Sequence, residues 1–175
     1  MPKTSDNGEY TDPTTDTDTE KSAWSATLAD MDALAADYED EGWKTVTIPA
    51  GHTAPESPDS GVEGRFGLVY VIPGNYADAF EEAFETGEFP QYDVFRNETE
   101  REVFLVTILA DPETETAIFI AGGFTRYDSR PLIQAVQEEG EMYTHVQTLD
   151  ETVLGSFRHT DPKKFFPATD FTAGQ

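Results

Sequence analysis

The sequence predicts an α+β fold, with a mostly antiparallel sheet of about six to seven strands and three helices. Three segments repeat apolar residues at steps of three and four, which is typical of helices that cover a sheet. Around them lie short apolar runs bounded by turn residues, and two pairs of these runs predict hairpins. We expect a single domain over residues 23–160, with a disordered acidic tail over 1–22 and an irregular tail over 161–175.

The first helix follows the polar tail, where Ser22 suits an N-cap position. Its buried side consists of residues that recur with helical spacing: Trp24, Thr27, Leu28, Met31, Leu34, Ala35 and Tyr38. Gly42 can adopt the left-handed conformation that ends many helices. We therefore expect the helix to end there.

Two strands and a loop follow the first helix. Residues 44–49 predict a short strand, whereas the prolines and glycines of 50–64 predict a loop. Residues 66–72 are nearly all apolar, as in a strand that is buried on both faces.

The second helix follows a turn at 73–75, and we expect it to end at Gly87. The residues expected on its buried side are Tyr76, Ala79, Phe80, Ala83 and Phe84. Residues 92–95 then predict another short strand.

The strongest strand pair comes next. Residues 103–109 and 117–121 predict a hairpin, with Asp111-Pro112 in the turn. Gly122-Gly123 leads into a third helix, with Pro131 expected in its first turn and Gly140 at its end. A last hairpin is expected from 142–149 and 152–159.

The charge balance excludes several classes of function. The chain has 35 acidic residues against 11 basic ones, a formal net charge of -24, and no cysteine. Disulfides, thiolate zinc sites and cysteine nucleophiles are therefore excluded. Binding to nucleic acid or to an anionic membrane needs a basic surface, so we expect neither partner. No apolar stretch is long enough to span a membrane and the first residues lack a signal-peptide pattern, which predicts a cytoplasmic protein.

The acidic residues recur in every predicted helix rather than in one tail. This distribution favours adaptation to a halophilic, salt-rich cytoplasm, because molar salt shortens the screening length to roughly 3 Å and removes most self-repulsion. The alternative is an acidic protein that binds a basic partner or mimics DNA. The adaptation hypothesis predicts poor folding in low salt.

Four segments resemble a family of small, uncharacterised proteins from halophilic archaea. They are DMDALAADYEDEGW at 30–43, DPETETA at 111–117, EMYTHVQTL at 141–149 and FRHTDPKKFF at 157–166. The resemblance implies a halophilic archaeal protein and a domain of unknown function. It implies no activity, cofactor or site residue.

The last predicted hairpin determines whether two histidines can act together. A two-residue turn at Asp150-Glu151 places His145 opposite Ser156 and Met142 opposite His159. His145 then shares one face of the sheet with Tyr143 and Arg158, while His159 lies on the other face with Val146 and Phe157. We expect no shared metal site and two structural histidines.

Asp161 follows His159 by two residues and could orient it as a general base. The same residues before Pro162 also form an ordinary strand exit, and we prefer that interpretation.

Two positive segments are candidate binding sites. Arg126 and Arg130 follow the glycines at 122–123 and could bind a small anion at a helix N-terminus. The segment Lys163-Lys164-Phe165-Phe166 could bind a protein partner or a second copy of the chain. Alternatively its phenylalanines fold back over the sheet, which we prefer.

No catalytic or metal-ligating pattern stands out, so we expect a non-catalytic interaction or small-ligand-binding module without cofactors or metals. One alternative is a small enzyme that uses His145 or His159 with a carboxylate and Arg158. The other is a structural protein that self-associates through Phe165 and Phe166. The candidate ligand-binding residues are Arg126, Arg130, Tyr143, His145, Arg158 and His159.

Overall fold

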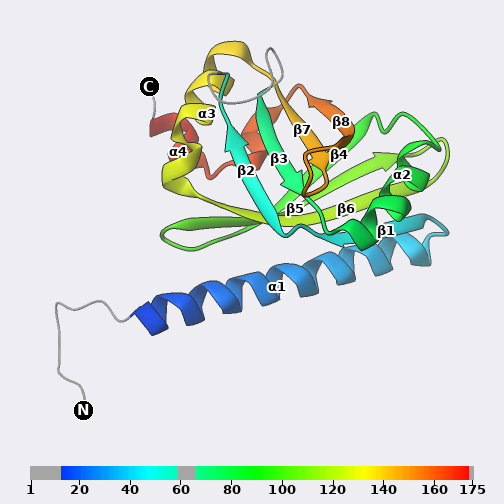
Figure 1. The fold of residues 1–175 in the computed structure, drawn as a ribbon, viewed down its shortest axis with the longest axis horizontal. Helices are drawn as coiled ribbons and strands as arrows, with labels where there is room; N and C mark the ends of the chain where they lie inside the picture. The colour runs from blue at the N-terminus through cyan, green and yellow to red at the C-terminus, as the bar shows by residue number, and fades with distance from the viewer. Residues whose placement is uncertain (1–12, 59–65, 174–175) are drawn as a thin grey trace.

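Two four-stranded sheets and the helices that cover them form the fold (Figure 1). The computed structural model describes residues 13–58 and 66–173. Its helices are α1 (Pro13–Asp40), α2 (Ala77–Phe84), α3 (Arg126–Glu139) and α4 (Ala168–Ala173), with short 3-10 helices η1 (Gly74–Tyr76) and η2 (Pro162–Phe165). Its strands are β1 (Lys44–Pro49), β2 (His52–Glu56), β3 (Gly67–Val71), β4 (Gln91–Glu98), β5 (Glu102–Asp111), β6 (Thr116–Thr125), β7 (Met142–Gln147) and β8 (Val153–His159).

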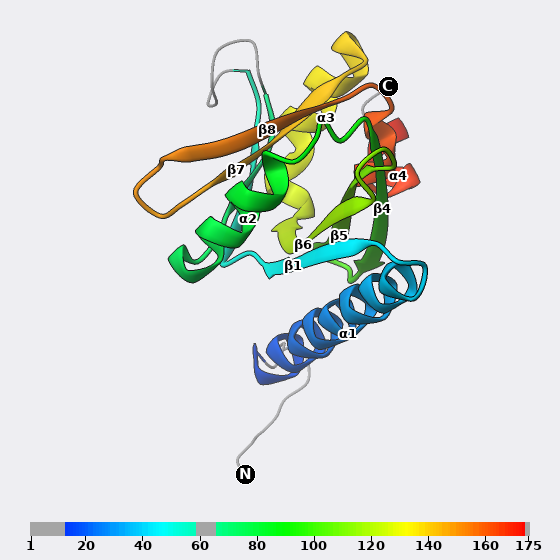
Figure 2. The ribbon, with the colours of Figure 1, turned by 90° about the vertical axis from the view of Figure 1, so that its right-hand side faces the viewer.

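The predicted α+β class is confirmed, but the strands form two sheets instead of one. The first sheet has the order β1-β6-β5-β4 and the second β2-β3-β7-β8. Neighbouring strands are antiparallel except for β1 with β6 and β3 with β7, which are parallel. The two sheets lie face to face, and α1 lies against the outer side of the first (Figure 2).

The core has an inner part between the sheets and an outer part under α1. Helices α2 and α3 lie at opposite ends of the molecule (Figure 1) and each contributes to one inner cluster. Phe80 of α2 packs with Tyr70 and Phe157, and Leu132 of α3 packs with Leu105. Met31 of α1 belongs to the outer cluster on the first sheet. The central strands β5 and β6 of this sheet are therefore buried on both faces.

Helix α1 begins at Pro13, so Ser22 lies inside it and the predicted N-cap is wrong. Residues 13–22, which the composition predicted to be disordered, belong to the helix, whereas 1–12 lie outside the described residues. Extending an anchored helix costs much less than starting one. Trp24 packs on Phe104 and Glu20 pairs with Arg101 at 3.4 Å, which anchors this end to the sheet.

The predicted loop at 50–64 contains strand β2, which pairs with β3. The prediction was wrong because Pro55 argues against a central strand, whereas β2 is at the edge of its sheet, where proline is tolerated. His52 therefore lies on a strand. Residues 59–65 of the predicted loop lie outside the described residues.

Two helix boundaries differ from the prediction. Helix α2 ends at Phe84, and Gly87 is required for another reason: a Cβ there would lie 1.8 Å from Oδ2 of Asp111. Strand β6 continues through the predicted helix start to Thr125, whose hydroxyl accepts a hydrogen bond from Asp128 N at 3.1 Å and caps α3. Pro131 therefore lies inside α3, beyond its first turn.

The register predicted for the last hairpin is confirmed over most of its length. Met142 pairs with His159 and His145 with Ser156, but an irregularity between Val146 and Gln147 shifts the pairing near the turn.

The C-terminal segment is more regular than predicted, because residues after 160 form η2 and α4. Phe165 and Phe166 are almost completely buried in the chain's own core, at 0% and 1% exposure. The prediction that they fold back is confirmed. They are not free to join a second copy or another protein, so that partner hypothesis is wrong.

Among the described residues, no helix is long and apolar enough to cross a membrane.

Candidate functional site

The glycines that precede Arg126, which were expected to lead into the helix, are part of strand β6. A Cβ on Gly122 would lie 2.3 Å from Thr53 Oγ1 and 2.5 Å from Tyr70 Cε1, so this glycine allows the two sheets to approach. The N-terminus of α3 is capped by Thr125 instead.

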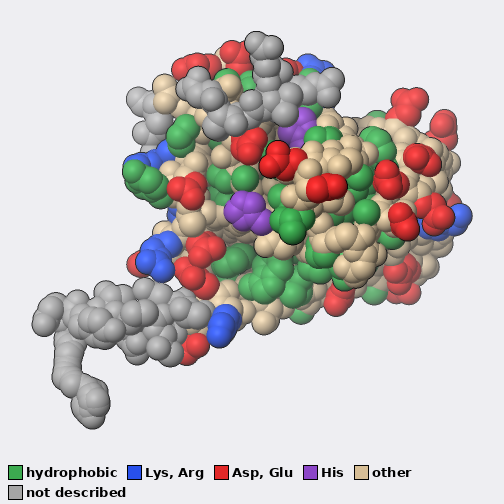
Figure 3. All heavy atoms as spheres, viewed as in Figure 1, with side chains coloured by type: hydrophobic (Ala, Val, Ile, Leu, Met, Phe, Trp, Pro, Cys, Tyr) green, Lys and Arg blue, Asp and Glu red, His purple; other side chains and the backbone are tan. Residues whose placement is uncertain are grey.

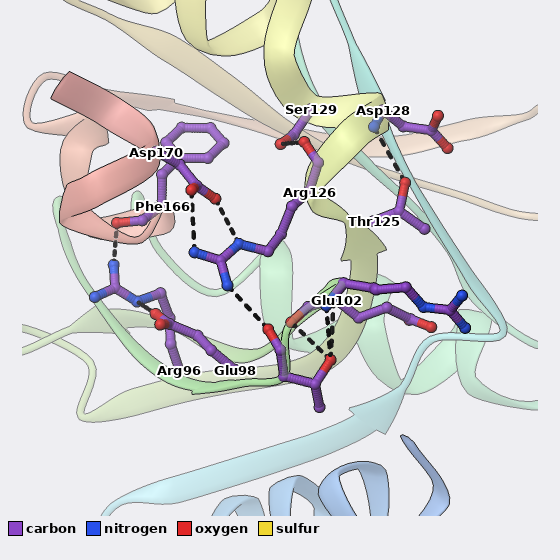
Figure 4. Close-up of polar contacts among 11 residues, drawn as sticks. Arg96, Glu98, Glu102, Thr125, Arg126, Asp128, Ser129, Phe166 and Asp170 are labelled. Carbon is purple, nitrogen blue, oxygen red and sulfur yellow. Dashed lines mark hydrogen bonds and ion pairs between the residues drawn. The ribbon is translucent and has the colours of Figure 1, made fainter. Parts of the chain in front are cut away.

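Arg126 binds the protein itself (Figure 4). Its Nε and Nη2 donate to the two carboxylate oxygens of Asp170 at 2.8 and 3.0 Å, and Nη1 donates to the carbonyl of Thr99 at 2.9 Å. The hydrogen bonds that Arg126 donates to Asp170 raise the pKa of Arg126. Arg130 lies over the ring of Tyr127, 4.2 Å from its centroid. Arg126 therefore holds α4 in place.

Arg96 makes a similar connection from strand β4 (Figure 4). Its Nη1 donates to the carbonyl oxygens of Phe166 and Lys164, the second at 3.1 Å, and its Nε pairs with Glu98 at 3.0 Å. Together the two arginines fix residues 164–170 along the edge of the first sheet.

Tyr143, His145 and Arg158 lie on one face of the second sheet, as the register predicts. His145 Nδ1 is hydrogen-bonded to Ser156 Oγ at 2.6 Å, and its ring is stacked parallel to that of Tyr143. The guanidinium of Arg158 binds Glu141, with 2.7 Å between Nε and Oε1. Arg158 is therefore paired with Glu141.

His159 faces the interior, on the opposite side of the hairpin from His145. Its Nε2 is 2.7 Å from Thr144 Oγ1, and its ring packs against Tyr92 and Phe165. Burial lowers the pKa of His159 to about 3, so the imidazole is neutral near pH 7.

Asp161 does not orient His159. The Nδ1 atom of His159 is buried and has no hydrogen-bond partner among the described residues, and the backbone N–H of Asp161 donates to the hydroxyl of Tyr92 at 2.8 Å. Within the same part of the chain, no group of three or more histidines and carboxylates could hold a metal ion.

A groove of about 510 Å³ lies along strand β4, one of the two edge strands of the first sheet. We call it the β4 groove. It is lined by residues 93–96 and, from the C-terminal segment, by Lys163, Lys164, Phe166, Ala168 and Phe171. Pockets for small ligands commonly have this size and combine an apolar lining with a few polar groups.

The apolar part of the β4 groove comes mainly from Phe95 and Phe171, because Phe166, also in the lining, is only 1% exposed. The rings of Phe166 and Phe171 are stacked, with centroids 6.3 Å apart. Phe95 is 44% exposed, which is unusual for so large an apolar side chain. The groove therefore offers aromatic surface on two sides.

The rim of the β4 groove carries two adjacent cations. Lys164 lies over the ring of Tyr92 at 5.1 Å, with Nζ 3.8 Å from an oxygen of Asp93. Lys163 is exposed and has no ion-pair partner among the described residues. These are two of the five lysines in a chain of net charge -24.

A second hollow, of about 440 Å³, lies between α1 and the start of α3. Glu20, Glu102 and Asp128 dominate its lining, with Arg101 and Arg126. Both arginines are bound to carboxylates, so this hollow offers no free cation to an anion.

Sequence reasoning identified the two lysines and the two phenylalanines that follow them, but missed Phe95, Arg96 and Phe171. The β4 groove forms only when residues nearly 70 positions apart meet, as in the Arg96–Lys164 hydrogen bond, which spans 68 residues. The one signal in the sequence was the apolar character of residues 92–95.

On the face shown in Figure 3, acidic side chains are scattered among apolar and neutral ones and do not gather in one hollow.

A family of unknown function, DUF7529, matches residues 11–167 of the chain. No curated protein and no solved structure matches the chain.

Proposed function

The chain belongs to DUF7529, a family of unknown function, and we propose that it is a non-catalytic module that binds a small ligand in the cytoplasm of a halophilic archaeon. The β4 groove carries this proposal. It combines an aromatic lining with free and partly free lysines at an otherwise acidic surface. An apolar surface with a few polar groups is sufficient for a binding site, whereas catalysis also needs positioned acid, base or nucleophile groups.

The surroundings of the histidines support a non-catalytic role. His159 is buried, burial lowers its pKa to about 3, and its Nδ1 has no hydrogen-bond partner among the described residues, which does not suit a general base near neutral pH. Phe165 and Phe166 are buried, which removes the surface required for self-association through them.

One observation favours the enzymatic alternative. The 2.6 Å contact between His145 and Ser156 resembles a base and a hydroxyl nucleophile, and Arg158 lies on the same face. Against this, Ser156 lies within strand β8 and not on a sharp turn that would present its hydroxyl to a substrate.

The halophilic part of the proposal rests on charge. The chain has a net charge of -24, and on the face shown in Figure 3 its acidic side chains are scattered, which suits a solvent of concentrated salt better than recognition of one basic partner.

The proposal is tested by screening small-molecule fragments against the isotopically labelled protein in molar KCl with heteronuclear NMR. We expect the shifted resonances to cluster at residues 93–96 and 163–171. Shifts centred on His145 and Ser156 would support the enzyme instead, and the absence of any localised shift would reject ligand binding.

A further inference from the structure

We propose that the ligand of the β4 groove is an amphipathic organic anion: a flat aromatic or short aliphatic body that carries one carboxylate, sulfonate or phosphate group. This inference rests on the proposed function and adds the chemical class of the ligand. The body would lie against Phe95 and Phe171, and the acid group would lie at Lys163 and Lys164.

The three cations that line the groove have different roles. The guanidinium of Arg96 binds Glu98 and two carbonyl oxygens of the C-terminal segment. Its role is therefore to attach this segment to strand β4. Lys164 is only weakly held by Asp93, at 3.8 Å. Lys163 has no ion-pair partner among the described residues, as noted above. The free positive charge of the groove is therefore concentrated on the two lysines.

The high salt expected for this protein makes a purely ionic ligand unsuitable. At molar salt the screening length is roughly 3 Å. The lysines therefore cannot attract a charged ligand from a distance and act on it only through direct ion pairs. The apolar contribution persists, because burial of aromatic surface does not depend on charge. Affinity must then come from the phenylalanines, while the lysines select a ligand with an acid group.

The edge of β4 argues against an extended peptide as the occupant. An added strand would need the free backbone groups of β4. The N–H of Val94 already donates to Oδ1 of Asp93 at 2.9 Å, and Arg96 binds the C-terminal segment alongside. A peptide strand would have to break both contacts, whereas a small molecule fits beside them.

The test uses a pair of probes that differ in charge: anilinonaphthalene sulfonate, which is an anion, and phenylnaphthylamine, which has the same rings and no charge. Binding to the full-length protein is measured in molar KCl by fluorescence, and the site is located by NMR. We expect the anion to shift residues 93–96 and 163–171 and to bind about fivefold more tightly than the neutral probe, which corresponds to two surface ion pairs.

Substitution of both lysines by glutamine (K163Q with K164Q) is expected to weaken the anion about fivefold and to leave the neutral probe unchanged. Lys44→Gln, at an exposed lysine of strand β1 outside the groove, is the matched control and should change neither. Phe95→Ala should weaken both probes, because this exposed ring contributes to the apolar lining without belonging to the core.

The outcomes separate this inference from the function on which it rests. Equal affinity for both probes, or no effect of the lysine substitutions, would overturn the anion class while leaving a binding groove. Failure of both probes to shift the groove would reject the groove as a ligand site. A shift of the Val94 amide by an aspartate-rich peptide, with neither small probe bound, would overturn the small-molecule class.

Discussion

Glu102, at the start of strand β5, makes the position of α1 depend on pH. Its carboxyl is hydrogen-bonded to Glu20 of α1, and partial burial together with this like-charged neighbour raises the pKa of Glu102 to about 7. Two carboxylates can share a hydrogen bond only when one of them is protonated. The N-terminal part of α1 is therefore held most firmly when Glu102 carries its proton.

Because this folded-state pKa lies above the ordinary value of 4.5, folding takes up a proton between about pH 4.5 and about pH 7. The free energy of unfolding contributed by Glu102 consequently falls as pH rises through that range, by about 1 kcal/mol after allowance for solvent screening. Glu102→Gln should flatten this fall and make the protein more stable than wild type above about pH 7.

Urea unfolding in molar KCl, measured across this pH range, tests the effect. Glu100→Gln, in the same turn, is the control and should keep the wild-type dependence. His159 contributes a slope of opposite sign, since its lowered pKa makes stability fall as pH drops below about 6.5. The contribution of His159 is the same in wild type and in the Glu102→Gln variant. The difference between their free energies of unfolding therefore measures the contribution of Glu102. Parallel curves would contradict the prediction.

The bidentate contact of Arg126 with Asp170 determines how firmly α4 is attached. Arg126→Lys keeps the charge but loses the paired geometry, so we expect a loss of about 1 kcal/mol and faster hydrogen exchange in α4. Arg130→Lys, whose parent side chain lies over the exposed Tyr127, should have little effect. Unchanged exchange in α4 of the Arg126 variant would show that the helix is held by its apolar contacts alone.

At the level of elements, the end of α3 depends on one backbone conformation. Gly140 caps the helix with φ of 75°, and its N–H donates to the carbonyl of Val136. A side chain there would meet nothing within 4 Å, so Gly140→Ala tests conformation without a steric clash. We expect a loss of about 1 kcal/mol.

Gly74 provides the matched comparison, because a side chain there also meets nothing within 4 Å and its φ is not positive. Gly74→Ala should change the free energy of unfolding by less than about 0.5 kcal/mol. Thermal unfolding of the two variants in molar KCl distinguishes them. Equal losses would mean that the left-handed conformation is not the reason for glycine at 140.

The elements that the sequence predicted well are those determined by local spacing. Gly140 was recognised as a helix end, and the pairing of His145 with Ser156 followed from counting outward from the turn. Strand β2 was not predicted, because Pro55 argues against a strand. The start of α3 was misplaced because Gly122 was interpreted as a turn residue, whereas it allows the two sheets to approach closely.

The β4 groove could not be predicted because its parts meet only in the folded protein. The sequence indicated that Phe165 and Phe166 fold back, but it contained no information on which strand they would cover. The same limit applies to Arg126, whose partner Asp170 lies 44 residues away in a segment that was expected to be irregular.

For the whole molecule, the dispersed negative charge predicts a dependence of folding on salt. We expect low secondary-structure content at about 50 mM KCl and a cooperative gain as KCl approaches molar concentration, followed by circular dichroism. Sucrose at matched osmolality is the control, since it favours the compact state without screening charge. Full structure at about 50 mM KCl, or an equal gain with sucrose, would contradict adaptation to salt.

The two parallel strand pairs have a consequence for the order of folding. Strand β1 pairs with β6 and β3 with β7, and both pairings join parts of the chain separated by more than seventy positions, as Lys44 with Thr116 shows. The hairpins β5–β6 and β7–β8 close short loops and should form first, and each then offers an edge onto which an earlier strand docks. A chain emerging from the ribosome therefore holds β1 unpaired, and β3 with β2 as its one available partner, until its second half has been made.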